Sequence, residues 1–349
     1  MSSVTTCSVK CEGLAKSYVR KKRPPGFWGA VRGVLSSERE LVPAVKGISF
    51  EIGRGERVGL IGENGAGKST TLKMLTGILV PTSGRLEVLG FDPWRQRRQL
   101  AARIGVVFGQ RPQLLWDIPV RETFTLLKTM YGVDDKLFDA TYAEAVKRLE
   151  LEPLLGVAVR KLSLGQRMRC DLAASLLHAP DIAFLDEPTI GLDVSVKEQV
   201  REFIVEMQRR FGTTLVLTTH DLKDITETCD RILLLDRGEL LFDGSLREFE
   251  RRFATTRRIL LDLEKPVTEG NDAELRAALL ALGGELVEHR GHRVVVSYQR
   301  DGAAPALTQC LLSRLPVSDI VLERSDIDSV VASIYRRGAS SGAVDKGAA

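Results

Sequence analysis

Eight consecutive residues decide the expected fold of this chain, Gly62-Glu63-Asn64-Gly65-Ala66-Gly67-Lys68-Ser69. They match the phosphate-binding pattern of a glycine, four residues and Gly-Lys-Ser, and they overlap the end of an apolar run at 57–62. Glycines let backbone N–H groups curl around phosphates, and the positive end of a following helix attracts the same negative charge. The stretch therefore predicts a phosphate-binding loop between a buried strand and a helix.

The residues of this loop have expected roles in binding ATP and Mg²⁺. Lys68 adds a point charge beside the β- and γ-phosphates, and Ser69 is expected to hold the magnesium ion. The loop residues expected to bind the nucleotide are Gly62, Asn64, Gly65, Ala66, Gly67, Lys68, Ser69 and Thr70.

Further apolar runs predict the sheet that carries this loop. The runs at 182–186, 214–218 and 231–235 are short and continuously apolar, as is typical of strands buried on both faces. Apolar residues between them recur at spacings of three and four and predict an amphipathic helix: Val196, Val200, Phe203, Ile204, Met207 and Phe211. The expected fold class is α/β with a mainly parallel sheet, a P-loop NTPase core.

The run from Ile182 to Glu187 ends in two carboxylates, Asp186 and Glu187. Charges at the end of a buried strand are costly unless they meet a cation or a substrate. We expect Asp186 in the magnesium shell and Glu187 as the residue that orients or deprotonates the attacking water. A strand end that simply reaches solvent is the alternative, and the phosphate-binding loop upstream disfavours it.

A third element lies between the loop and the carboxylates, Leu162-Ser163-Leu164-Gly165-Gln166-Arg167, followed by an apolar helical run at 168–178. The order of phosphate loop, Leu-Ser-x-Gly-Gln element, Asp-Glu strand and Thr219-His220 resembles the ATP-binding subunits of ABC transporters across residues 8–250. The resemblance implies a head-to-tail dimer with a second copy or a paralogous ATPase. It also implies that Ser163 and Gly165 donate to the γ-phosphate bound by the other subunit, with Gln166 beside them.

The same resemblance assigns four more site residues. Gln110 matches the glutamine that senses magnesium, and His220 matches the histidine that contacts the γ-phosphate. Tyr18 matches the aromatic residue that stacks on adenine, and Asp193 matches the aspartate that couples the two sites of the dimer. Their alternatives are a polar loop residue, a structural histidine, a packing tyrosine and a helix N-cap, respectively.

Leu164 departs from the family pattern, which has glycine at this position. Its branched side chain lies at a crowded turn that is expected to face phosphate. Activity is expected to persist, because Ser163 and Gly165 are present, and weaker ATP-driven closure of the dimer is the alternative. A regulatory subunit with weak hydrolysis is therefore one alternative, which the presence of Glu187 and His220 opposes.

The pattern changes near Arg257 and predicts a second, small α+β domain. Its expected strands lie at 258–263, 284–289, 292–298 and 317–323, and its expected helices at 272–282, 304–314 and 326–336. The predicted organisation is an ATP-binding domain at 1–250 with an insertion at 19–41 and a helical subdomain at about 111–180, an accessory domain at 257–337 and a disordered tail at 338–349.

Composition limits the partners. The 50 Lys and Arg residues against 46 Asp and Glu give a net charge of +4, too even to predict nucleic-acid binding. The five cysteines lack the paired spacing of a zinc site. No signal peptide and no run of about 20 apolar residues is present, so a peripheral place on the cytoplasmic face of the membrane, through separate membrane subunits, is expected.

The expected work is export through ABC-2 type permeases, because the small C-terminal domain and the ending at 326–335 resemble exporter ATPases. The segment from Arg111 to Thr125, with Trp116, is expected to meet the membrane subunits. The insertion at 19–41, with the Phe27-Trp28 pair, is either a solvated loop or a segment close to lipid headgroups. An ABC importer and a soluble ABC ATPase without a transport role are the alternatives.

Overall fold

The computed structural model describes residues 7–21, 39–108, 112–253, 256–266, 272–299 and 304–324. The chain divides into two compact units, residues 1–246 and 247–349, each of which is described by itself. Gln110, the Phe27-Trp28 pair, the helix expected at 326–336 and the tail expected at 338–349 lie outside the described residues.

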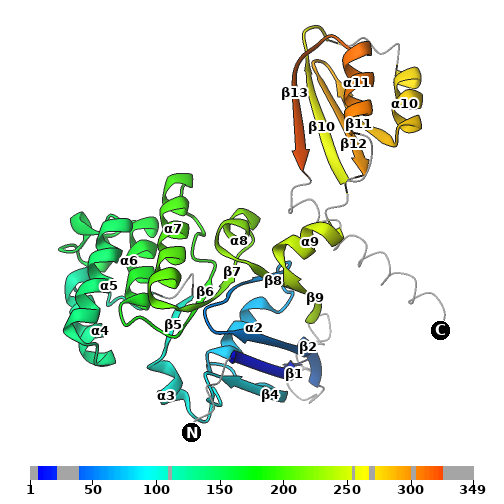
Figure 1. Ribbon diagram of the computed structural model, residues 1–349. Coiled ribbons are helices and arrows are strands. Elements are labelled where there is room, and N and C mark those ends of the chain that lie inside the picture. The colour runs from blue at the N-terminus through cyan, green and yellow to red at the C-terminus, as the bar shows by residue number, and fades with distance from the viewer. Residues whose placement is uncertain are drawn as a thin grey trace, which may run out of the picture. The chain divides into compact units, whose positions relative to one another are not determined.

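A six-stranded sheet forms the centre of the first unit, in the order β5-β6-β7-β3-β8-β9 (Figure 1). All neighbours pair in parallel except β8 and β9, which are antiparallel. The bounds are β3 Arg57–Ile61, β5 Ile104–Phe108, β6 Ile182–Asp186, β7 Thr214–Thr218, β8 Arg231–Asp236 and β9 Glu239–Ser245. The predicted buried strands are confirmed, and every residue of β7 is buried.

The strand order explains where a site can form. β3 lies between β7 and β8, and β6 lies next to β7. The carboxyl ends of β6, β7 and β3 therefore meet at one edge of the sheet, where α/β proteins bind their ligands. Helices α2 (Lys68–Leu75), α7 (Val194–Phe211) and α8 (Leu222–Thr228) follow β3, β6 and β7 in the chain. The predicted amphipathic helix is α7, and it buries Val200, Phe203, Ile204 and Met207.

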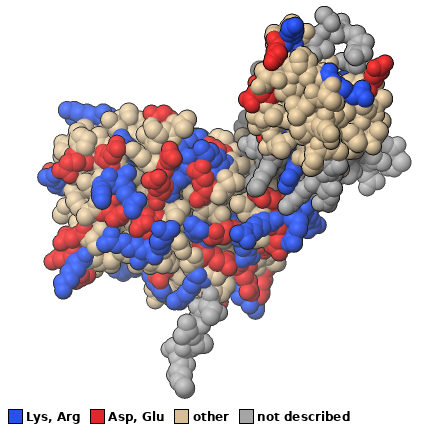
Figure 2. Space-filling model, turned by 45° about the horizontal axis from the view of Figure 1, so that its top comes forward, with Lys and Arg blue, Asp and Glu red and all other residues tan. Residues whose placement is uncertain are grey.

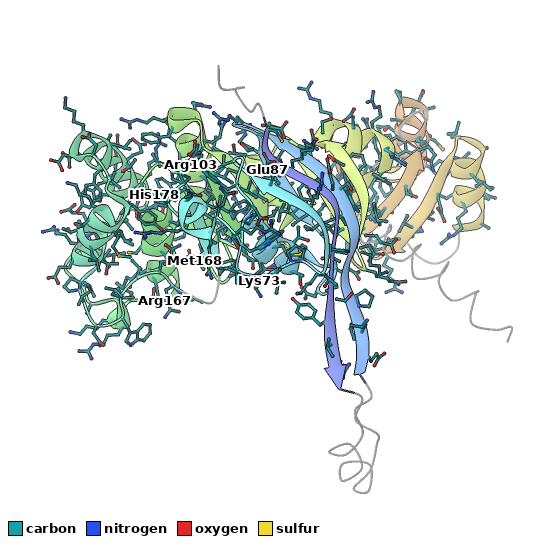
Figure 3. All side chains as sticks on the ribbon, turned by 90° about the horizontal axis from the view of Figure 1, so that it is seen from below. Lys73, Glu87, Arg103, Arg167, Met168 and His178 are labelled. Carbon is teal, nitrogen blue, oxygen red and sulfur yellow. The ribbon has the colours of Figure 1, made fainter. Side chains whose placement is uncertain are left out.

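A second, antiparallel sheet has the order β2-β1-β4 and was not predicted. Its strands are β1 (Cys7–Lys21), β2 (Arg39–Gly53) and β4 (Ser83–Val88). One hydrophobic core joins both sheets through α2, with Leu14, Ile52, Leu72 and Phe184 among its members. Figure 3 shows β1 and β2 running on together past the rest of this unit. Both ends of the expected insertion belong to this ribbon, since Val19 pairs with Leu41 and Arg20 with Glu40.

The region expected to be a helical subdomain contains α4 (Val120–Tyr131), α5 (Asp135–Arg148) and α6 (Leu164–Leu176), with short 3₁₀ turns at Glu152–Leu154 and Val159–Lys161. Helix α3 (Arg97–Ala101) precedes β5. The helical run expected at 168–178 begins four residues early. The physical reason is the capping box formed by Ser163 and Gln166, which satisfies free N–H groups at the helix start.

The second unit is a four-stranded antiparallel sheet in the order β11-β12-β10-β13, with a βαββαβ chain order of the ferredoxin-like type. Its elements are β10 Thr256–Leu263, α10 Asp272–Ala281, β11 Gly284–Arg290, β12 Arg293–Gln299, α11 Ala304–Arg314 and β13 Val317–Arg324, and α9 (Leu246–Phe253) precedes them. Leu261, Leu279, Val296 and Leu307 belong to its own hydrophobic core. The strands and helices from β10 to β13 lie where the sequence predicted them, whereas α9 was not predicted.

Within the described residues, no helix is long and apolar enough to cross a bilayer. All five cysteines are free.

Candidate active site

The phosphate-binding loop connects β3 to α2, as the sequence predicted. Gly67 is the N-cap of α2 and has φ 107°, a conformation that L side chains rarely adopt. A Cβ atom at Gly67 would lie 2.7 Å from the backbone oxygen of Ala44, and one at Gly62 would lie 2.6 Å from that of Leu235. Only glycine fits at either position. The glycines allow the tight curve of the loop, in which backbone N–H groups can bind an anion.

Lys68 is the charged group of the loop, and it is 7% exposed. Its Nζ donates to the backbone oxygens of Gly62 at 2.6 Å and Glu63 at 3.1 Å. Burial lowers the pKa of Lys68, while the carboxylates of Glu187, Asp186 and Glu63 act in the opposite direction. The ammonium group is therefore held inside the loop by the backbone, at the place where phosphate oxygens are expected.

Two of the three residues expected at the magnesium site are close together, and the third, Gln110, lies outside the described residues. Ser69 Oγ donates to Asp186 Oδ1 at 3.3 Å, although the two residues are 117 positions apart. Thr218, at the end of β7, donates to the same carboxylate oxygen. Mg²⁺ is commonly bound by one or two protein oxygens together with substrate phosphates, so the Ser69–Asp186 pair fits this ion.

Glu187 and His220 follow the neighbouring strands β6 and β7. His220 Nδ1 lies 3.6 Å from Glu187 Oε1. Glu187 has φ 53°, an uncommon conformation for a residue with a side chain, and its N–H donates to the backbone oxygen of Thr218 at 2.9 Å. A carboxylate and an imidazole thus stand side by side at the edge where Lys68 lies, which suits them to act on a phosphate-bound substrate and a water.

Ser163 begins α6, and its contacts are local. Its Oγ accepts from the N–H of Gln166 at 3.2 Å, and its own N–H donates to Gln166 Oε1 at 2.9 Å. Among the described residues, no hydrogen bond or ion pair joins Ser163, Gly165 or Gln166 to the phosphate-binding loop. The structure therefore groups the loop with Asp186, Glu187 and His220, and leaves the Leu-Ser-x-Gly-Gln element outside that group.

Leu164 packs against the turn before α7. A Cβ atom at Gly191 would lie 3.0 Å from Leu164 Cδ2, and one at Gly165 would lie 3.3 Å from Leu192 Cδ2. The leucine that departs from the family pattern thus contacts the turn that carries Asp193. Asp193 is the N-cap residue of α7 but makes no side-chain capping bond, so its carboxylate is not used as a cap.

Tyr18 lies in β1 opposite Val42 and is 43% exposed. Lys16 Nζ lies 5.8 Å from the centre of its ring. A half-exposed ring can receive a flat base by stacking, in keeping with its expected role.

Asp171 is a residue that the sequence reasoning missed. It lies in α6, is 3% exposed, and accepts the backbone N–H of Gln113 at 2.6 Å. Burial raises the pKa of Asp171 to about 6, although backbone N–H groups of Gln113 and Leu114 act in the opposite direction. It therefore joins the segment that follows Gln110 to the helix that Ser163 begins. An acidic residue within an apolar helical run was the available signal.

Replacing Asp171 with asparagine should stabilise the first unit at neutral pH. The raised pKa means that the folded state binds a proton more tightly than the unfolded chain, so stability falls as pH rises from about 4 to 6. Asp171→Asn keeps an acceptor for Gln113 and cannot ionise. We expect the free energy of unfolding of the variant to exceed that of the parent by an amount that grows across this range and reaches on the order of 2 kcal/mol at pH 7. Thermal unfolding measured at several pH values tests this difference.

Asp181→Asn is the control for this experiment, because Asp181 is 42% exposed and pairs with Arg103 at the surface. It should show no such pH-dependent gain. A constant difference between Asp171→Asn and the parent at all pH values would mean that Asp171 has an ordinary pKa.

The loop after β3, the carboxylates at the end of β6 and the histidine after β7 together define a P-loop ATPase. A family model described as ABC transporter matches residues 45–190. The ABC transporter ATP-binding protein NatA of Bacillus subtilis is 34% identical over 61% of this chain and 86% of its own length. The daunorubicin resistance ATP-binding protein DrrA3 of Streptomyces coeruleorubidus is 30% identical over 82% of this chain and 89% of its own length.

A solved structure agrees with these relatives. The dimeric, post-hydrolysis ATP-binding cassette MJ0796, bound to ADP and Pi, superposes with a TM-score of 0.56 at 27% identity over 68% of this chain and 99% of its own. The chain belongs to the ABC transporter ATP-binding proteins. It is the ATP-binding, ATP-hydrolysing subunit of an ABC transporter, as the sequence predicted.

Proposed function

We propose that ATP bound at the loop after β3 is hydrolysed by the residues at the ends of β6 and β7. Lys68 neutralises β- and γ-phosphate charge, and Ser69 and Asp186 would hold Mg²⁺, which supplies further charge neutralisation when bound. Glu187 orients the attacking water and accepts its proton, and His220 contacts the γ-phosphate. The observation that carries this proposal is the meeting of groups from three separate parts of the chain at one sheet edge.

The complete site is proposed to need two ATPase chains, either two copies or a copy and a paralogue. Ser163 stands at the start of a 13-residue helix, where N–H groups and the helix dipole favour an anion. Its contacts with Gln166 do not involve the loop of its own chain. The dimeric state of the MJ0796 cassette supports the pairing of two chains. In the proposed head-to-tail arrangement, Ser163 and Gly165 contact the nucleotide of the other chain.

The proposed work is export through separate ABC-2 type membrane subunits, which would keep this chain at the cytoplasmic face of the membrane. The alignment with the daunorubicin resistance protein spans 289 residues, more than the first unit contains, and therefore extends into the second unit. Import is the second candidate, since the ATPase core alone does not set the direction. The face seen in Figure 2 mixes basic and acidic side chains over the first unit, unlike a nucleic-acid-binding stripe.

An exposed apolar surface is available for a membrane subunit in the segment where the sequence predicted one. Leu115 is 45% and Trp116 is 51% exposed. Arg167, labelled in Figure 3, lies with its guanidinium carbon 5.6 Å from the centre of the Trp116 ring. Exposed apolar groups of this kind commonly mark an interface.

Purification of the tagged full-length chain, expressed with its native gene neighbours, from detergent-solubilised membranes tests this function. We expect a multi-span membrane protein to co-purify in stoichiometric amount, and its class then distinguishes an ABC-2 permease from an importer. Recovery only in the soluble fraction would contradict the transport role and leave the ATPase intact.

A matched pair of variants tests whether the membrane protein contacts the surface around Leu115. Leu115→Asp should reduce recovery of the membrane protein about tenfold, because a charge would be buried in the interface. Leu241→Asp is the control, since Leu241 on β9 is 43% exposed and lies in another part of the unit. Equal recovery with both variants would place the interface elsewhere.

A further inference from the structure

A buried carboxylate lies behind the catalytic edge of the sheet. Asp224, on α8, is fully buried and accepts hydrogen bonds from three side chains. Arg201 Nη1 donates at 2.9 Å, Thr219 Oγ1 donates at 3.0 Å, and Thr189 Oγ1 also donates to it. The donors come from α7 and from the segments that follow β7 and β6, so four parts of the chain meet at one carboxylate.

The hydrogen bonds and the nearby cation offset the unfavourable free energy of burying the Asp224 carboxylate. An isolated carboxylate in a protein interior is strongly unfavourable, whereas one with a cation and several donors is tolerated. Arg201 is 4% exposed and supplies the cation, and its Nε also pairs with Glu227 Oε2 at 2.5 Å. Thr189 is 3% and Thr219 is 2% exposed, so water cannot replace Asp224 as the hydrogen-bond partner of either hydroxyl.

The two threonines are next to the proposed catalytic residues. Thr189 is two positions after Glu187, and Thr219 is directly before His220. Glu187 has φ 53°, and a backbone conformation of this kind persists only where its surroundings hold it. On one side the Glu187 N–H is bonded to Thr218, and on the other the chain is fixed through Thr189 to Asp224.

We propose that Asp224 is a positioning residue for ATP hydrolysis, which fixes the segments carrying Glu187 and His220 relative to each other. Asp224 acts through Thr189 and Thr219 and does not contact the nucleotide. The 3.6 Å approach of His220 to Glu187 is the geometry that it maintains. This inference rests on the roles proposed above for Glu187 and His220, and it adds the group that holds them in register.

A purely structural role is the competing explanation, because Asp224 and Arg201 also tie α8 to α7. The two roles differ at Thr189. Valine has the shape of threonine without the hydroxyl, and serine keeps the hydroxyl without the methyl group. A positioning role depends on the hydrogen bond to Asp224, whereas packing depends on the volume of the side chain.

The experiment compares Thr189→Val and Thr189→Ser in the full-length chain, measuring steady-state ATP hydrolysis, ATP affinity by calorimetry and the thermal midpoint. We expect Thr189→Val to lower kcat about tenfold while ATP affinity stays within about twofold, because misplacement of catalytic groups costs rate more than binding. Thr189→Ser should keep kcat within about twofold of the parent. Equal losses in both variants, or parent kcat in Thr189→Val, would overturn the proposal.

Asp224→Asn should lower kcat further than Thr189→Val, and adding Thr189→Val to it should cause little more loss, because both changes break the same contact. Thr213→Val is the matched control. Thr213 is also fully buried and donates its hydroxyl to Pro180 O at 2.8 Å, but it precedes β7 at the opposite end from the site. It should lower the thermal midpoint and leave kcat unchanged, and a tenfold fall in its kcat would overturn the proposal.

Glu187→Gln, assayed in parallel, distinguishes a failure of the proposed function from a failure of the positioning role of Asp224. Turnover at the parent rate in Glu187→Gln would reject the proposed function and this inference with it. Loss of turnover in Glu187→Gln together with parent kcat in Thr189→Val would reject only the positioning role of Asp224.

Discussion

Glu187→Gln should retain ATP binding and nearly stop turnover. Glutamine has the shape of glutamate but cannot accept a proton from the attacking water at neutral pH, so the general-base contribution is lost. Such contributions are about 10²- to 10⁴-fold, and we expect kcat to fall by about 10³-fold. Single-turnover release of phosphate, with ATP affinity measured on the same preparation, tests the prediction.

Glu239→Gln is the control for this change. Glu239 pairs with Lys46 at 3.0 Å on the surface, and its side chain is 58% exposed. Pairs of this kind contribute little to stability, so its turnover should match the parent. Ordinary turnover in Glu187→Gln would remove Glu187 from its proposed role and leave the binding loop as assigned.

The parallel strands were predictable because they are buried on both faces. Such strands must be apolar throughout, so Ile182–Asp186 and Thr214–Thr218 stand out as continuous runs bounded by polar residues. The phosphate-binding loop was predictable for a related reason. At Gly67 and Gly62 any Cβ atom would collide with backbone, so only glycine fits and its presence in the sequence indicates the loop conformation.

The strand order and the second sheet could not be read in the same way. β3 pairs with β7 and β8, which are 158 and 173 positions away in the chain, and no local pattern specifies such partners. The long strands β1 and β2 contain polar residues and several bulges, so neither a continuous apolar run nor a clean alternation marks them.

The buried carboxylates were missed because their function depends on distant partners. Asp224 receives hydrogen bonds from Thr189 and Arg201, which are 35 and 23 positions earlier in the chain. In the sequence it is one acidic residue in a polar stretch, where a solvated surface position is the more common explanation. Only its burial and its three donors distinguish it. Asp171 also depends on a distant partner, since Gln113, whose N–H it accepts, is 58 positions earlier in the chain.

Lys68→Ala should abolish the phosphate clamp while the fold persists. Alanine is the best helix former, so α2 can still begin at this position. A charge-assisted hydrogen bond contributes about 1.5–3 kcal/mol, which corresponds to roughly a 10- to 150-fold loss of ATP affinity. Turnover should fall at least as far, because the leaving β-phosphate gains negative charge as its bond to the γ-phosphate breaks, and Lys68 would stabilise that charge. Calorimetric titration with ATP, with and without Mg²⁺, measures the effect.

Lys73→Ala provides the comparison within the same helix. Lys73, labelled in Figure 3, lies one and a half turns further along α2 and is exposed, whereas Lys68 is buried inside the loop. Both variants remove one positive charge, so a general loss of electrostatic attraction would affect them alike. A loss confined to Lys68→Ala shows that the held ammonium group binds the phosphates, and equal affinity in the two variants would mean that the loop does not clamp them through Lys68.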